Sequence, residues 1–271
     1  MSSAANHSAD LVLQEWLECD VVDDLTGEYL PPELVRKAKI EEIMEIYRRG
    51  VWSETSTLEC WQKTGSAPIR VRWVVVNKGD KENPIIRARL VARHIAAKFG
   101  GKGLAESFAA MPPFEMIKYS VTRMLKSCEL GVSGETPPLG AESMGPPVSG
   151  VRKKKRKMLF VDVSKAHLYA PTNEGSRAYV ELPPECSKVG VCGRLNFWLY
   201  GMRPASRGWE EEYCRRLVSL GFEAGKGSPC CFYRASDDVA CVVHGDDFTF
   251  EGPAEALKLI PESLRILADE S

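Results

Sequence analysis

The sequence predicts an α+β fold in which helices and strands are intermixed. Short runs with alternating apolar and polar residues predict strands, as at positions 68–78 and 178–182. Apolar residues that recur every three or four positions predict helices, as at positions 113–128 and 204–220. Most links between these segments are short, which suits antiparallel strand pairing and argues against a regular βαβ repeat.

The first predicted helix follows Pro31 and Pro32, because proline is favoured in the first turn of a helix. Its end is predicted at Gly50, since glycine commonly follows the last helical turn. Four apolar residues recur at helical spacing and predict the face of this helix that packs into the core. They are Ile40, Ile43, Met44 and Tyr47.

Positions 68–78 and 85–92 predict a β-hairpin. In its second strand Arg87 and Arg89 alternate with apolar residues, so we expect the two arginines on one face. Guanidinium groups on one surface suit contact with phosphate. A solvated basic edge strand, which deters aggregation, is an equally good interpretation.

The middle of the chain has low complexity. Positions 131–150 are dense in Gly, Pro, Ser and Glu, and we expect a flexible insert at about 129–157. Six consecutive basic residues occupy positions 152–157. Such a run is a nuclear import signal, a polyanion-binding patch or, more often, a flexible solvated arm.

Two later segments carry the candidate site. Positions 158–164 predict an apolar strand that contains Asp162, and a carboxylate in such a run is costly to bury without a partner. Two further apolar runs meet at Gly245, Asp246 and Asp247 and predict a β-hairpin with an acidic tip. A capping aspartate and a polar turn that binds nothing are the simpler interpretations of these two segments.

The three aspartates suggest metal chemistry if their strands are neighbours in one sheet. Adjacent carboxylates repel each other, and Mg²⁺, which prefers oxygen ligands, would offset that repulsion. Carboxylates that converge at one end of a sheet can hold two Mg²⁺ ions about 3.5–4 Å apart, an arrangement that serves phosphoryl transfer.

Composition limits the class of protein. The chain has 271 residues, 44% hydrophobic content and a net charge of −1, so polyanion binding must come from local patches. Nine cysteines without Cys-x-x-Cys spacing indicate reduced thiols in an intracellular compartment, the cytoplasm or nucleus, and argue against a zinc ribbon. No apolar run is long enough to predict a membrane span, and no signal peptide predicts secretion. Positions 1–30 are acidic, lack Lys and Arg, and predict a disordered leader.

Five segments resemble, in the same order, motifs of the reverse transcriptase domain of Ty1/copia-type LTR retrotransposons. The first reads Arg-Ala-Arg-Leu-Val-Ala, and the second contains Phe-Val-Asp-Val-Ser. The last reads His-Gly-Asp-Asp where the family has Tyr-Val-Asp-Asp. The segments occupy positions 87–92, 160–168, 179–184, 199–209 and 244–247.

The resemblance implies the fingers and palm of a right-hand polymerase at positions 31–252, with an antiparallel palm sheet flanked by helices. A truncated palm helix would follow at positions 253–271, without a thumb. Asp162, Asp246 and Asp247 would be the catalytic residues and would bind Mg²⁺ (or Mn²⁺).

The resemblance also implies a nucleotide site and substrates. Arg87, Arg89, Val163 and His167 would bind the nucleotide, with His167 in the place of an aromatic residue that excludes a 2′-hydroxyl. The partners would be an RNA or DNA template with its primer, and a dNTP that is added to the primer 3′-hydroxyl.

The chain departs from the family pattern at several points. His244 and Gly245 replace Tyr and Val, and Pro204 replaces Gln. No segment matches the family's thumb or RNase H domain. One alternative hypothesis is therefore a catalytically inactive, truncated remnant that at most binds nucleic acid. A two-metal phosphohydrolase that uses the same carboxylates is a weaker alternative.

Overall fold

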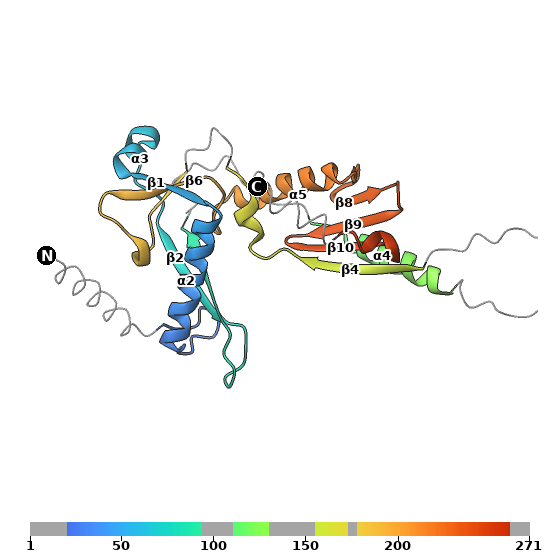
Figure 1. Cartoon of the computed structure of the whole chain (residues 1–271), viewed down its shortest axis with the longest axis horizontal. Helices are drawn as coiled ribbons and strands as arrows, with labels where there is room; N and C mark the ends of the chain where they lie inside the picture. Colours follow the sequence, from blue (N-terminus) through green and yellow to red (C-terminus); the bar gives the residue numbers. More distant parts are fainter. Residues whose placement is uncertain (1–20, 94–110, 130–154, 173–177, 261–271) are drawn as a thin grey trace, which may run out of the picture. The chain divides into compact units, whose positions relative to one another are not determined.

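The computed structural model describes residues 21–93, 111–129, 155–172 and 178–260 (Figure 1). Two compact units make up the chain: residues 1–107 with 170–208, and residues 108–169 with 209–271. The predicted α+β class is confirmed, because every pair of strands in the three described sheets is antiparallel.

Several predicted segments lie outside the described residues. They are positions 1–20 of the acidic leader, positions 130–154 of the insert and positions 261–271 at the C-terminal end.

In the first unit, helix α2 (Pro32–Arg48) packs against the hairpin formed by β2 (Val71–Asn77) and β3 (Ile86–Ala92). The predicted helix and its glycine terminator are confirmed, since Gly50 follows the helix with φ of 60°. The shared core contains Val35 of the helix and Ala88 of the hairpin.

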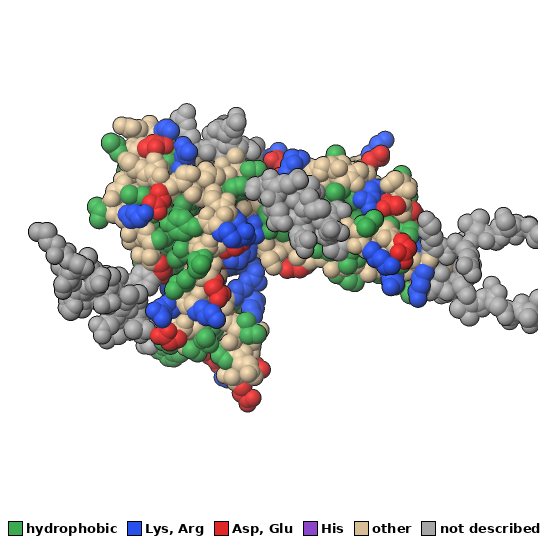
Figure 2. Space-filling view, viewed as in Figure 1, with side chains coloured by type: hydrophobic (Ala, Val, Ile, Leu, Met, Phe, Trp, Pro, Cys, Tyr) green, Lys and Arg blue, Asp and Glu red, His purple; other side chains and the backbone are tan. Residues whose placement is uncertain are grey.

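The predicted core face of α2 is wrong. Ile40 is 46%, Met44 65% and Tyr47 43% exposed, and Figure 2 shows apolar side chains on the surface over α2. The helix has apolar residues on two sides, and the side with Val35 and Ile46 is the one that is buried. A helix with two apolar stripes can turn only one of them toward a single hairpin.

The prediction of disorder is also wrong for residues 21–30. The Asp23 carboxylate accepts hydrogen bonds from the backbone N–H groups of Leu25 at 2.7 Å and of Asn77 at 2.6 Å. These bonds, the strongest from Asn77, lower the pKa of Asp23. Leu30 joins the core of the first unit. The acidic character of this segment therefore serves backbone capping as well as solvation.

A second sheet of the first unit has the order β1-β6-β5, with β1 (Trp52–Ser56), β6 (Val191–Leu195) and β5 (Tyr179–Val180). Helix α3 (Thr57–Thr64) follows β1, and the Ser56 hydroxyl accepts a hydrogen bond from the Leu58 N–H at 3.0 Å. The short helix η4 (Pro184–Cys186) follows β5.

The second unit is built on a five-stranded sheet of order β4-β10-β9-β8-β7 (Figure 1). The strands are β4 (Arg156–Asp162), β7 (Glu223–Gly225), β8 (Ser228–Arg234), β9 (Val239–His244) and β10 (Asp247–Pro253). The other elements are α4 (Phe114–Glu129), η3 (Ala166–Tyr169), the C-terminal part of α5 (Ala205–Ser219) and α6 (Ala254–Leu257). Because β4 begins at Arg156, the last positions of the expected flexible insert are strand.

Helices cover the two faces of this sheet. On one face, Tyr213 of α5 makes edge-to-face contacts with Phe232 at 6.1 Å and Phe248 at 5.8 Å between ring centroids. On the other face, Arg123 of α4 reaches Glu251 of β10, with 3.5 Å between Nε and Oε2. Residues at alternate positions of β10 therefore contact different helices.

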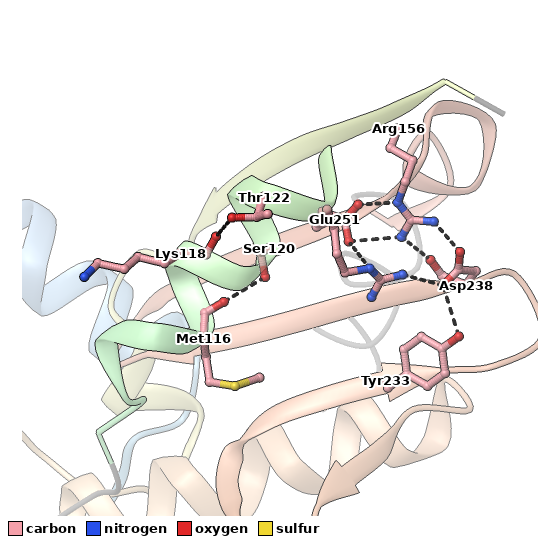
Figure 3. A network of polar contacts seen from close by, with 9 residues as sticks. Met116, Lys118, Ser120, Thr122, Arg156, Tyr233, Asp238 and Glu251 are labelled. Atoms are coloured by element: carbon pink, nitrogen blue, oxygen red, sulfur yellow. Dashed lines mark hydrogen bonds and ion pairs between the residues drawn. The ribbon is translucent and has the colours of Figure 1, made fainter. Parts of the chain in front are cut away.

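A polar network lies at the end of the sheet where β4 begins (Figure 3). Glu251 is fully buried, and the Arg156 guanidinium binds its carboxylate with one N–O distance of 3.0 Å. Arg156 also binds the carboxylate and, at 2.9 Å, the carbonyl of Asp238. Arg123 and Tyr233 donate to Asp238 Oδ1 at 2.6 and 3.0 Å. Burial would raise the pKa of Asp238, but these donors outweigh it and the pKa is lowered.

No helix among the described residues is both long enough and apolar enough to cross a membrane.

Candidate active site

Asp162 and Asp247 lie directly opposite each other at one end of the β4–β10 pair. The Val163 N–H donates to the Asp246 carbonyl at 3.0 Å, so Val163 and Asp246, the next pair along the strands, are a hydrogen-bonded pair. Because hydrogen-bonded and open pairs alternate, Asp162 and Asp247 form an open pair, with Cα atoms about 4.5 Å apart and side chains on the same face. The two strands are neighbours in one sheet, which is the condition that the metal-site interpretation requires.

A tight hairpin presents the other predicted aspartate. Asp247 pairs with His244 of β9, so the connection consists of Gly245 and Asp246 alone. Gly245 has φ of 65°, and a positive φ at the first of two central residues is typical of a type II′ turn. Asp246 is thus held in the turn itself, one residue from Asp247.

The register aligns three polar side chains across three strands. His244, Asp247 and Asp162 occupy paired positions of β9, β10 and β4, and all three are exposed. Paired residues of antiparallel strands project from the same face. The sequence showed His244 as a departure from a motif but gave no sign of its place in this row, since that place depends on the register.

Trp209 supports the hairpin from the opposite face of the sheet. Its indole Nε1–H donates to the Gly245 carbonyl at 2.8 Å, and its ring lies 6.3 Å from Phe248 and 5.8 Å from Tyr213. Burial raises the pKa of the Tyr213 hydroxyl. A cavity of about 60 Å³ lies beside these rings and is also bordered by Val163. The aspartate-bearing tip therefore rests on packed aromatic side chains.

Replacing Trp209 by Phe is expected to loosen the hairpin tip. The substitution removes the hydrogen bond to Gly245, which is worth about 0.5–1.5 kcal/mol. We expect faster amide hydrogen exchange at the ends of β9 and β10. We also expect a loss of stability of the size of that hydrogen bond.

Trp52→Phe is the matched control, because the indole N–H of this buried residue has no hydrogen-bond partner in the described structure. Equal exchange at the hairpin in Trp209→Phe and wild type would show that this hydrogen bond does not hold the tip.

The electrostatics of the open pair favour a bound cation. Two carboxylates directly opposite each other on antiparallel strands destabilise the pairing. Their oxygen atoms are the donors that Mg²⁺ and Mn²⁺ accept. Among the described residues, however, no three His, Cys, Asp or Glu side chains are positioned to hold a metal ion. The donor chemistry of Asp162 and Asp247 fits such an ion.

The remaining predicted residues are divided between the two units. Arg87 and Arg89 lie on β3 of the first unit and alternate with buried residues, as predicted. Arg87 is exposed, and the Arg89 guanidinium lies 5.1 Å from the ring centroid of Tyr200. In the second unit, Val163 follows Asp162, and His167 is half-buried in η3.

Comparison with models of known protein families gives no match, and comparison with curated proteins gives none either.

Proposed function

We propose that this chain is the fingers and palm part of a reverse transcriptase of the copia type, an RNA-directed DNA polymerase. The single observation that carries the proposal is the pairing of Asp162 with Asp247, with Asp246 beside them in the turn. The five ordered sequence segments support it, because they place these aspartates at the positions of the family's catalytic residues.

The proposal assigns a role to each residue of the site. Asp162, Asp246 and Asp247 hold Mg²⁺ or Mn²⁺ at the exposed end of the sheet. When bound, such ions lower the pKa of an attacking hydroxyl and neutralise charge on the leaving group. The hairpin turn orients Asp246 and Asp247, and pairing with β10 orients Asp162.

The nucleotide site follows from the same proposal. On β3 of the first unit, Arg87 and Arg89 are suited to contact phosphate, since guanidinium groups form bidentate bonds with phosphate oxygens. Val163 and His167 border the nucleotide, and His167 takes the place of the aromatic residue at the sugar. The β2–β3 hairpin is then part of the fingers, and the five-stranded sheet is the palm.

Primer extension tests the proposal. The purified chain is mixed with an RNA template, a labelled DNA primer, dNTPs and either Mg²⁺ or Mn²⁺. We expect primer elongation that is stopped by EDTA. No elongation with either ion, at concentrations where an intact copia-type enzyme works, would reject the activity.

A second candidate function is nucleic-acid binding without catalysis. The observation in its favour is that no three potential metal ligands are gathered among the described side chains. This function predicts binding of RNA or DNA that weakens as salt rises, with no elongation under any of the conditions above.

A further inference from the structure

Phe160 lies on β4 on the same face of the sheet as Asp162. It pairs with Thr249 of β10, as Asp162 pairs with Asp247. Alternate residues of a strand share a face, and two residues span about 7 Å. Phe160 is therefore the next side chain along β4 from the aspartate pair on that face.

The phenyl group of Phe160 is 71% exposed. The opposite face of the sheet carries the packed core, where Phe248 and Phe250 are 3% and 0% exposed. On the face of Phe160, α4 lies farther along the sheet, where Arg123 reaches Glu251. Single exposed apolar residues are common, so exposure alone would carry no meaning. Here strand pairing places Phe160 on the face of the sheet that carries the two carboxylates.

This arrangement suits one kind of ligand. The aspartates repel the phosphates of a nucleic-acid strand unless a cation lies between them. A neutral aromatic ring beside them can hold a base or sugar without adding to that repulsion. Base–aromatic stacking tolerates any sequence and contributes substantially to the binding of single strands.

We propose that Phe160 is a stacking platform for the nucleoside at the end of the nucleic-acid strand that reaches the aspartates. This inference rests on the proposed polymerase function and adds a substrate-binding residue to that site. Phe160 holds the terminal nucleoside by its uncharged surface, while the phosphate is directed toward Asp162 and Asp247.

Fluorescence anisotropy with a labelled primer–template hybrid, in Mg²⁺ and without dNTP, tests the inference. Phe160→Ala is expected to bind about ten-fold more weakly than wild type, the size of one lost stacking contact. The slope of log affinity against log salt should stay the same, because no charge is removed. Phe160→Tyr should bind as wild type does. The exposure of Phe160 means that these variants keep the fold.

Val218→Ala is the matched control. Val218 is 56% exposed and lies on α5, which covers the opposite face of the sheet. The affinity of the Val218→Ala variant for the hybrid should therefore equal that of wild type. Phe160→Ala with wild-type affinity, or with a changed salt slope, would overturn the stacking role alone. Failure of the wild-type chain to bind or extend the hybrid would instead reject the proposed function and the stacking role together.

Discussion

Asp162→Asn is expected to lower nucleotide incorporation by about a hundred-fold or more. A metal ion contributes several kcal/mol of charge stabilisation in the transition state, and each 1.36 kcal/mol is a factor of ten in rate. Asparagine keeps the size of the side chain and removes the charge that would hold the ion. Single-turnover incorporation with Mg²⁺ measures the effect.

The same variant should be more stable than wild type when no divalent ion is present. Asp162 opposes Asp247 across the strand pair, and removal of one charge relieves a repulsion of about 0.2–1 kcal/mol. Urea denaturation in EDTA measures this gain. A loss of activity accompanied by a gain of stability separates a functional carboxylate from a structural one.

Glu223→Gln is the control for both measurements. Glu223 is an exposed residue of β7, at the other edge of the same sheet, so its replacement removes an equal charge far from the pair. We expect wild-type activity and a stability change below about 0.5 kcal/mol. Activity of Asp162→Asn within a few-fold of the control would remove Asp162 from the metal site.

The largest effect on stability is expected for Glu251→Gln. The Glu251 carboxylate is fully buried between the guanidinium groups of Arg156 and Arg123. Removing its charge leaves the partly buried guanidinium groups of Arg156 and Arg123 with Asp238 as their remaining carboxylate partner. Breaking a buried pair costs up to about 3–5 kcal/mol. Amide hydrogen exchange of β9 and β10 in increasing urea would report the loss in the second unit.

Glu255→Gln provides the comparison for Glu251→Gln. Glu255 lies on α6 four residues later and pairs with Lys258, and both side chains are largely exposed. Exposed pairs contribute about 0–1 kcal/mol, so this variant should stay close to wild type. If Glu251→Gln costs no more than Glu255→Gln, the network around Arg156 does not stabilise the unit.

Local sequence patterns predicted much of the second unit. Two apolar runs on either side of the Gly-Asp-Asp tip predicted the β9–β10 hairpin, and helical spacing predicted α4 and α5. Trp209, Tyr213 and Leu217 form the buried face of α5. These features depend on residues that are close in the sequence, where periodicity is informative.

Features that depend on distant contacts were less accessible. The register of β4 against β10 decides whether Asp162 lies on the same face of the sheet as Asp247. A shift of one residue would turn the Asp162 side chain to the other face. Arg156 stood in a basic run that favoured a solvated arm, yet it pairs with Glu251 across 95 positions. Tertiary packing likewise selected one of the two apolar stripes of α2.

Binding of Mn²⁺, followed by electron paramagnetic resonance, tests the metal site most directly. The wild-type chain is titrated beside Asp162→Asn and Asp247→Asn, with Glu223→Gln as the control. We predict that wild type and Glu223→Gln bind Mn²⁺ at a saturable site that each of the two aspartate variants weakens at least ten-fold. Equal Mn²⁺ binding by all four proteins would contradict a metal site at the β4–β10 pair.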